Sequence, residues 1–261
     1  MPLLQGKTVI VSGVGAGLGH EVAAAVVTEG GNAVLGARTE ANLAKTAAEV
    51  DPGGARVAYR PTDITEEARC GALADLAVER FGRIDALVQV AAFDSHFGGL
   101  QDADFAAWAG VLDVNLLGSL RMTRACLPAL KERGGSVVLI GTQSSVAAPS
   151  QVRQAAYAAS KGALTSAMYS LARELGPHRI RVNTVQPGWM WGPPVEAYVT
   201  LTARAEGVPE AEVKRRLTER MALPELATDG DVAQACVFLA SDRARAITGQ
   251  SLLVNAGELM R

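Results

Sequence analysis

Short apolar runs alternate with longer stretches of helical periodicity along most of the chain. Continuous apolar runs between turn residues predict buried strands, whereas apolar residues spaced three or four apart predict helices. Strands are therefore predicted over Thr8–Val11, Ala33–Leu35, Arg56–Tyr59, Ala86–Val90, Ser136–Ile140, Arg181–Val185 and Ser251–Val254. Helices are predicted over Gly17–Glu29, Glu40–Val50, Glu66–Phe81, Gln154–Leu175 and Asp229–Ala240, with one long helix or two between Asp104 and Leu130.

Strands separated by helices predict an α/β fold. The expected architecture is a Rossmann-like, doubly wound parallel sheet of about seven strands, with helices on both faces. We find no linker, internal repeat or low-complexity segment in the sequence. Residues 1–261 are therefore predicted to form a single domain.

The pattern changes after the sixth strand. Gly192, Pro193 and Pro194 are expected to break regular structure there. The long, charged helical stretch that follows is expected to belong to a substrate lid inserted at about residues 189–222. Asp229 is the expected N-terminal cap of the last helix.

The composition limits the expected partners and compartment. The 261 residues carry a net charge of −2, so no global basic field attracts nucleic acid or an anionic membrane. Cys70, Cys126 and Cys236 are widely spaced and are expected to be reduced and buried, and no metal site is predicted. The sequence has no secretory signal pattern and no apolar run of the roughly 18 residues that a membrane helix needs. A soluble, cytoplasmic protein is therefore expected.

Four glycines follow the first predicted strand. Gly13, Gly15, Gly17 and Gly19 alternate with other residues, and Leu18 lies between the last two. A glycine-rich turn that opens a helix offers backbone N–H groups to the pyrophosphate of a dinucleotide. A tight turn without a ligand is the alternative. The position between the first strand and the first helix favours the nucleotide.

The end of the second strand bears on the choice of coenzyme. A site for NAD usually places a carboxylate there to bind the ribose 2′-hydroxyl. In this chain no carboxylate precedes Glu40, and Arg38 can pair with a 2′-phosphate through its planar guanidinium. NADP(H) is therefore the preferred coenzyme. NAD(H) is the alternative, with Arg38 stacked on the adenine.

Tyr157 and Lys161 are four residues apart in the run AAYAASKGAL and would share one face of a helix. An ammonium beside a phenol favours the phenolate, so Lys161 is expected to lower the pKa of Tyr157 from its usual value of about 10. Such a tyrosine can exchange a proton with an alcohol oxygen. Taken alone, a pair of this kind is more often a surface pair, but next to a dinucleotide it suggests hydride transfer.

Several motifs together resemble the short-chain dehydrogenase/reductase family. They are the glycine turn, Asn115 in DVNLLGS, Ser144, Tyr157-x-x-x-Lys161, Pro187-Gly188 and the ending FLASDRARAITGQSLLVNAG. The resemblance covers essentially the whole chain. It implies an NAD(P)-dependent oxidoreductase acting on CH–OH and C=O groups. It also implies a homo-oligomer, a tetramer or dimer, with the long helices after Asp104 and around Lys161 at one interface.

The resemblance implies roles for individual residues. Tyr157 would be the general acid/base, Lys161 would lower its pKa and hold the nicotinamide ribose, and Ser144 would bind the substrate oxygen. Asn115 would hold a water that links Lys161 to solvent, and Asp63 would reach the adenine. Further coenzyme contacts are implied for Leu18, Ile64, Ala91, Pro187, Gly188 and Met190.

Each of these residues also has an ordinary structural interpretation. Asn115 can be an interior helix amide, Asp63 a helix cap and Ser144 a loop hydroxyl. Ser145 is an alternative catalytic serine, although a spacing of thirteen residues to the tyrosine favours Ser144. Gly192 departs from the family pattern, which usually has threonine there.

The substrate is expected to lie at the carboxyl ends of the fourth, fifth and sixth strands. Phe93 and His96 in the first of these loops, and Trp189 and Trp191 in the third, are predicted to line its pocket together with Ser144. The alternatives are a solvated histidine, and tryptophans that pack the lid onto the body or face another subunit.

The sequence thus predicts an oxidoreductase that transfers a hydride between NADP(H) and a ketone or secondary alcohol. An NAD(H)-dependent alcohol dehydrogenase of the same family is the nearest alternative. A non-redox lyase and a dinucleotide-sensing protein on the same fold are the others, although both tend to lose the glycine turn, the tyrosine or the lysine, and this chain keeps all three.

Overall fold

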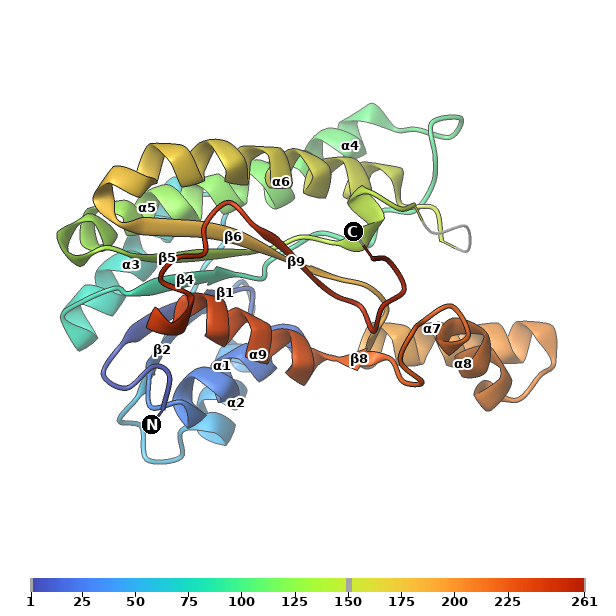
Figure 1. The fold of residues 1–261 in the computed structure, drawn as a ribbon, viewed down its shortest axis with the longest axis horizontal. Helices are drawn as coiled ribbons and strands as arrows, with labels where there is room; N and C mark the ends of the chain where they lie inside the picture. The colour runs from blue at the N-terminus through green and yellow to red at the C-terminus, as the bar shows by residue number, and fades with distance from the viewer. Residues whose placement is uncertain (1, 149–151, 261) are drawn as a thin grey trace.

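The computed structural model describes residues 2–148 and 152–260. It contains a seven-stranded parallel sheet in the order β3-β2-β1-β4-β5-β6-β9 (Figure 1). These strands are β1 (Thr8–Ser12), β2 (Asn32–Ala37), β3 (Val57–Pro61), β4 (Ala86–Gln89), β5 (Gly135–Ile140), β6 (Ile180–Pro187) and β9 (Ser251–Val254). The short strands β7 (Met190–Trp191) and β8 (Ala227–Thr228) pair separately. The fold class predicted from the sequence is confirmed.

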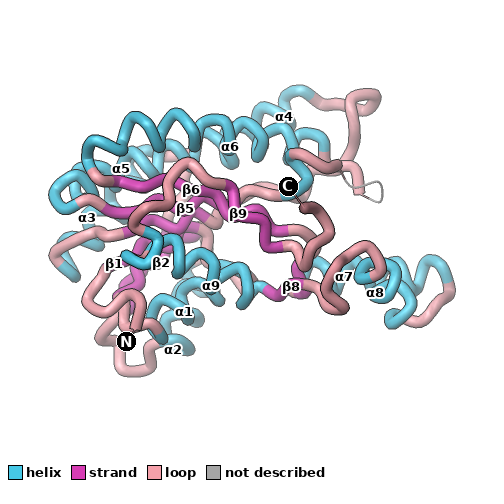
Figure 2. Tube along the Cα trace, in the orientation of Figure 1, coloured by secondary structure: helices cyan, strands magenta, loops and turns pink. Residues whose placement is uncertain are grey.

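Helices cover both faces of the sheet (Figures 1 and 2). One face carries α1 (Leu18–Thr28), α2 (Glu40–Val50) and α9 (Asp229–Ala240), and the other carries α3 (Glu67–Phe81), α5 (Ser119–Arg133) and α6 (Ala155–Leu175). The remaining helices are α4 (Phe105–Leu112), α7 (Pro193–Glu206) and α8 (Glu210–Thr218). None of the described helices combines the length and the apolarity needed to cross a membrane.

The central strands are apolar because both of their faces are buried. In β1, Val9 and Val11 join the core under α1 and α9, whereas Ile10 joins the core under α3, α5 and α6. A strand buried on both faces has no alternation of polar and apolar residues. This burial explains why the strands could be recognised as continuous apolar runs.

Two local expectations after the sixth strand are wrong. Pro193 and Pro194 do not break regular structure but begin α7, because proline is compatible with the first helical turn. Asp229 does not cap α9. Thr228 does so, since its hydroxyl accepts a hydrogen bond from the backbone N–H of Asp231, whose carboxylate bonds back to Thr228.

The stretch expected to be one helix or two is continuous but irregular. A π-helical turn over Asp113–Gly118 joins α4 to α5. Such turns widen the helix locally and are common at functional sites. Asn115, one of the residues implied in catalysis, lies inside this turn and is fully buried.

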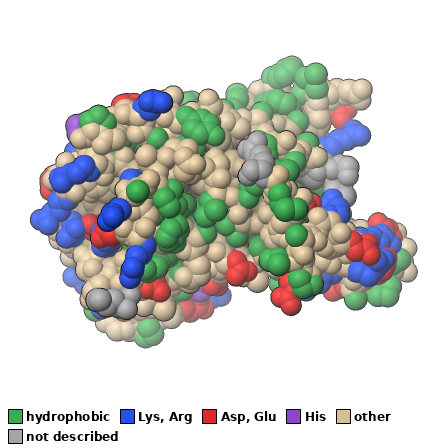
Figure 3. Space-filling view, viewed as in Figure 1, with side chains coloured by type: hydrophobic (Ala, Val, Ile, Leu, Met, Phe, Trp, Pro, Cys, Tyr) green, Lys and Arg blue, Asp and Glu red, His purple; other side chains and the backbone are tan. Residues whose placement is uncertain are grey.

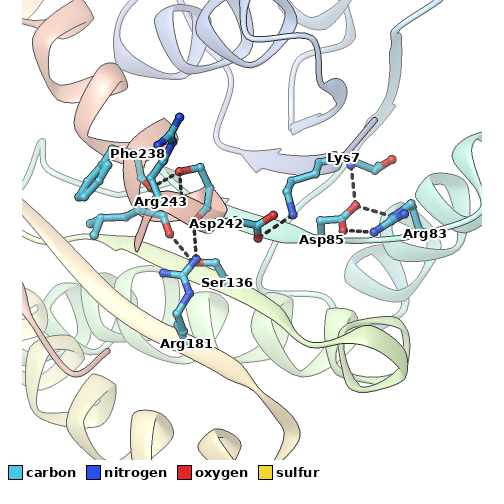
Figure 4. A network of polar contacts seen from close by, with 11 residues as sticks. Lys7, Arg83, Asp85, Ser136, Arg181, Phe238, Asp242 and Arg243 are labelled. Carbon is cyan, nitrogen blue, oxygen red and sulfur yellow. Dashed lines mark hydrogen bonds and ion pairs between the residues drawn. The ribbon is translucent and has the colours of Figure 1, made fainter. Parts of the chain in front are cut away.

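Polar contacts concentrate at the end of the sheet where the strands begin (Figure 4). The Asp85 carboxylate accepts bonds from the backbone N–H of Thr8 at 2.9 Å and from the Arg83 guanidinium at 2.7 Å. The Lys7 ammonium pairs with Asp242 at 2.9 Å. Lys and Arg side chains gather at this end in the space-filling view (left in Figure 3). The opposite end, where the strands finish, holds the candidate catalytic residues.

Candidate active site

The glycine turn is shaped by close packing against the sheet. Gly13 has a φ of 101°, and a methyl group on it would overlap the backbone nitrogen of Ala91. A methyl group on Gly19 would overlap the carbonyl oxygen of Gly13 and lie 2.8 Å from Cα of Val14. Gly15 differs, because a methyl group there would meet nothing within 4 Å. Two of the four glycines are therefore required by packing, and Gly15 is not.

The turn ends at the N-terminus of α1. Gly17 is the N-cap residue, and no side chain accepts a hydrogen bond from the first turn of this helix. The N–H groups of the first turn and the helix dipole therefore suit an anionic ligand. Leu18 is buried and packs into the core behind the turn, so its side chain supports the helix start.

A cleft of about 680 Å³ lies over the turn, between the ends of β1, β2 and β4. The order of these strands makes this the point where the topology reverses, where doubly wound sheets bind nucleotides. Its lining residues are Ser12–Gly15, Gly36–Thr39, Asn42, Thr62–Thr65, Val90–Asp94, Gly110 and Val114. The lining thus includes six predicted coenzyme contacts: Gly13, Gly15, Arg38, Asp63, Ile64 and Ala91.

Charges at the far end of this cleft come from Arg38 and Asp63. The backbone N–H of Thr65 donates to the Asp63 carboxylate at 2.9 Å and lowers its pKa, and the nearby Arg38 guanidinium lowers it further. The Arg38 side chain is exposed and makes no ion pair with the described residues. Its charge is therefore available to a ligand phosphate.

Tyr157 and Lys161 both lie in the first half of α6. Lys161 is only 1% exposed, and its ammonium donates to the carbonyl oxygen of Ile140 at 2.6 Å. Lys161 Nζ lies 5.8 Å from the centre of the Tyr157 ring. The predicted common helix face is therefore present, and it points into the protein at the end of β5.

The predicted effect of Lys161 on the tyrosine is not seen with the protein's own groups. Burial raises the pKa of Tyr157 well above 10, and the negative charge of Asp94 raises it further, whereas a hydrogen bond with the Thr142 side chain opposes this shift. Burial also lowers the pKa of Lys161 to about 8. Desolvation is the largest cause of both shifts, and it cannot be predicted from the spacing of the two residues in the sequence.

The two candidate serines differ in their contacts. Both lie in a short 3₁₀ turn over Gln143–Ser145. The Ser145 hydroxyl donates to the carbonyl oxygen of Thr142 at 2.8 Å. Ser144 lies in the lining of the same cavity as Tyr157, and Ser145 does not. Of the two candidate serines, Ser144 is therefore the one that shares a cavity with Tyr157.

Asn115 connects the helix interruption to the loop after β4. Its side-chain oxygen accepts a bond from the backbone N–H of Phe93 at 2.6 Å, and its side-chain nitrogen donates to the Phe93 carbonyl at 3.0 Å. The same nitrogen is 2.9 Å from the Ser160 hydroxyl. The side chain therefore holds the loop in place; its implied contact with a water stays a prediction.

A second cavity, of about 420 Å³, opens beside Tyr157. Asp94 lines this cavity and also the coenzyme cleft, so the two spaces adjoin. The lining residues are Asp94, Ser95, Phe97, Thr142–Ser144, Val152, Gln154, Tyr157, Gly188, Trp189, Pro194, Val195 and Tyr198. Of the predicted substrate contacts, Ser144 and Trp189 are in this set. Phe93 lines the coenzyme cleft instead, and His96 and Trp191 line neither space.

The two tryptophans have different surroundings. Trp189 packs on Tyr198 with ring centres 5.0 Å apart, and both line the substrate cavity. The Trp191 ring carries the Lys214 ammonium 3.9 Å from its centre, so it packs within the unit formed by α7 and α8. Trp189 is therefore a cavity wall, whereas Trp191 holds the α7–α8 unit together.

The loop after β6 approaches the cavity closely. Gly188 lines it, and a methyl group there would lie 2.8 Å from Oε1 of Gln143. Pro187 is the last residue of β6, and Met190 lies in β7 and packs against the core of the α1 face. Gln143 itself was not predicted from the sequence. It is held by Asn255, whose side-chain nitrogen donates to it at 2.9 Å.

The described residues show no other reactive centre of the kinds considered above. Cys70, Cys126 and Cys236 are free and buried. Across residues 2–148 and 152–260, no three His, Cys, Asp or Glu side chains come together as metal ligands.

Known proteins resemble this chain over nearly its whole length. A family model described as enoyl-(acyl carrier protein) reductase matches residues 13–258. A short chain dehydrogenase/reductase of Aspergillus oryzae, astE, is 31% identical, with 97% of this chain and 95% of the relative covered. The chain belongs to the short-chain dehydrogenase/reductase family.

Other relatives agree with this assignment. The 7alpha-hydroxysteroid dehydrogenase of Escherichia coli is 29% identical, with 97% of this chain and 94% of the relative covered. The crystal structure of a proposed short-chain dehydrogenase/reductase from Burkholderia xenovorans matches with a TM-score of 0.89 at 30% identity and covers 99% of this chain and 98% of its own. The family resemblance found in the sequence is confirmed, and the protein is an NAD(P)-dependent oxidoreductase that acts on CH–OH groups.

Proposed function

We propose that this short-chain dehydrogenase/reductase transfers a hydride between NADP(H) and a ketone or secondary alcohol, with Tyr157 as general acid/base. One observation carries the proposal: Tyr157 and Ser144 line a cavity that adjoins the cleft over the glycine turn. A carbonyl group in that cavity would meet two hydroxyl groups, with the coenzyme cleft next to it.

The cleft suits a dinucleotide. Close packing at Gly13 brings the turn against the backbone that follows β4, and no side-chain bond caps the first turn of α1 among the described residues. These N–H groups would hold the pyrophosphate. Arg38 and Asp63 would lie at the adenosine end, and Tyr157 and Lys161 at the nicotinamide end. When bound, the nicotinamide supplies or accepts the hydride.

Within the protein, Tyr157 would deliver a proton to the carbonyl oxygen during reduction and remove it during oxidation. Its high pKa keeps the phenol protonated at neutral pH, which suits reduction. For oxidation the phenolate must form, and a charged Lys161 nearby would stabilise it. Ser144 would donate a hydrogen bond to the same oxygen as negative charge develops.

The preference for NADP(H) rests on Arg38. This exposed guanidinium lines the cleft at the end of β2 and makes no ion pair with the described residues. A 2′-phosphate would pair with it in a bidentate manner. Arg38→Ala should therefore weaken NADPH binding by at least about tenfold and NADH binding by much less. Titration of both coenzymes by fluorescence tests this, and equal losses would remove the case for phosphate recognition.

The role of Tyr157 is tested by removing one oxygen atom. Tyr157→Phe should leave coenzyme affinity close to normal and reduce turnover by at least about 100-fold. The assay is oxidation of NADPH and of NADH at 340 nm with a panel of ketones. A variant that keeps most of its activity would show that another group moves the proton. Tight coenzyme binding with no turnover of any ketone by the wild type would favour a sensing role.

Two further features bear on the proposed partners. The helices α7 and α8 lie together at one end of the molecule (Figure 1). Pro194, Val195 and Tyr198 of α7 line the substrate cavity. These contacts support the proposal that residues 189–222 form a lid over the cavity.

Phe105 on α4 and Tyr169 on α6 are large and exposed, which supports an interface between copies of the chain in a homo-oligomer.

A further inference from the structure

The substrate cavity has an uneven charge. Its walls are mostly apolar and include Trp189 and Tyr198, which follow β6, and Phe97 from the loop after β4. Among the described residues that line it, Asp94 alone carries a formal charge. No cation is therefore available in this set to balance a negatively charged substrate.

Two cations lie near the cavity without lining it. Lys161 is 1% exposed, and its ammonium donates to the carbonyl oxygen of Ile140, so a substrate in the cavity does not contact it. Asp94 raises the pKa of Lys161, so the two charges act on each other. Arg153 is exposed and lies between Val152 and Gln154, which both line the cavity, but it is not part of the lining itself. Asp94 is therefore the charged side chain that a substrate in the cavity would contact directly.

Asp94 is held in place by the surrounding backbone. The residue before it, Phe93, is fixed by two hydrogen bonds to the Asn115 side chain, at 2.6 and 3.0 Å. The carbonyl oxygen of Asp94 accepts a bond from the side-chain nitrogen of Gln154 at 2.5 Å. Ser95 donates to the carboxylate at 3.1 Å. These bonds hold the backbone of the loop, so the exposed Asp94 side chain starts from a defined position beside the cavity.

We propose that the enzyme acts on neutral or cationic alcohols and ketones with an apolar body, that it disfavours anionic ones, and that Asp94 sets this selectivity. The inference rests on the proposed function of the same cavity. An apolar ring or chain would pack between Trp189 and Phe97. An ammonium or hydroxyl group on the substrate would face Asp94 at the mouth, whereas a carboxylate or sulfonate would be repelled there.

The test is a matched set of three ketones that differ in one substituent: 4-methylacetophenone, 4-(aminomethyl)acetophenone and 4-acetylbenzoate. At low ionic strength, kcat/KM for the neutral and ammonium ketones should exceed that for the carboxylate by at least about tenfold. Asp94→Asn should bring the three values together, mainly by improving the carboxylate. Asp102→Asn removes the same charge from an exposed position of the same loop outside both cavities, and it should leave the ratios unchanged.

Two results would overturn the inference. One is a wild-type enzyme that uses the carboxylate as well as the neutral ketone. The other is an Asp94→Asn enzyme in which all three rates change by one common factor, because that would place the effect on Tyr157 rather than on the substrate. Calorimetry can measure the affinity of the same three compounds for the enzyme saturated with NADP⁺. It shows how affinity depends on ligand charge without requiring turnover. Charge-ordered binding with no turnover would contradict the proposed reaction and leave the selectivity standing.

Discussion

Gly13→Ala is the substitution whose effect follows most directly from the geometry. The methyl group would overlap the backbone nitrogen of Ala91 and lie 2.8 Å from the carbonyl carbon of Val90. Backbone atoms at the end of a central strand cannot move aside as a flexible side chain can. The φ of 101° is also unfavourable for alanine. A left-handed backbone costs about 1–2 kcal/mol, and overpacking about 1–3 kcal/mol, so the expected loss of stability is about 2–5 kcal/mol.

Gly15→Ala is the matched control. It adds the same methyl group to the same turn, but nothing lies within 4 Å of it and φ at this position is not in the left-handed region. Its free energy of unfolding should stay within about 0.5 kcal/mol of the wild type. Urea unfolding of the three proteins without coenzyme gives these values directly. In a thermal melt, Gly13→Ala should lower Tm by about 4–20 °C.

Coenzyme binding provides a second measurement on the same variants. Because the backbone of Ala91 lines the cleft, displacing it should weaken NADPH in Gly13→Ala even at a temperature where the variant is folded. A free energy of unfolding for Gly13→Ala within about 1 kcal/mol of the wild type would refute this explanation, because strain and overpacking predict a loss of about 2–5 kcal/mol. A greater loss of stability in Gly15→Ala than in Gly13→Ala would refute it as well.

Two other expectations concern proton transfer and helix capping. Reduction should slow as the pH rises through about 8, where Lys161 loses the proton that burial has already destabilised. This is measured as a falling limb of kcat/KM; the apparent value belongs to the Tyr157–Lys161 pair, and a flat profile to pH 10 would contradict it. Thr228→Ala removes the capping box of α9 and should cost about 1 kcal/mol in urea unfolding. Thr39→Ala removes an N-cap residue that makes no capping bond, so it should cost less, and equal losses would show that the capping bond is not the cause.

The sequence was sufficient for the fold because the central strands have a simple physical signature. Residues buried on both faces of a parallel sheet form unbroken apolar runs, and β1, β4 and β5 are entirely or almost entirely buried. The glycine turn was visible for a related reason. Packing requires glycine at Gly13 and Gly19 whether or not a ligand binds, so the signal does not depend on the coenzyme.

The cavity walls could not be predicted in the same way. Asp94 reaches the cavity because Gly98 and Gln154, which are far apart in the sequence, pair as a bridge and bring the loop after β4 to the start of α6. No local pattern encodes that contact. Residue type alone suggests Phe93, His96 and Trp191 as substrate contacts. The backbone path of each loop instead places these residues outside the lining of the substrate cavity.

The tyrosine pKa shows where spacing fails as an argument. A separation of four residues places Tyr157 and Lys161 on one helix face but does not determine whether that face is exposed to solvent or buried. In water the ammonium would favour the phenolate. In this interior both charged forms lose their hydration, so the pKa of Tyr157 rises and that of Lys161 falls. Burial therefore keeps the Tyr157 phenol protonated and makes the Lys161 ammonium easier to deprotonate, without neutralising it below a pH of about 8.

The charged residues of the two adjoining cavities would favour different positions for the coenzyme phosphates and for the substrate. Arg38 stands at the end of β2, and Asp94 lies beyond the end of β4, with β1 and the uncapped start of α1 between them. Asp63 also lies at the Arg38 end of the cleft, where the guanidinium offsets its charge, whereas the described lining of the cleft has no cation beside Asp94. A dinucleotide that places its phosphates toward Arg38 and α1 would keep them away from Asp94, and the reversed orientation would set them against that carboxylate. A substrate carboxylate would meet the same repulsion. Since Asp94 borders both spaces, one acidic side chain would favour a single coenzyme orientation and exclude anionic substrates from the mouth beside it.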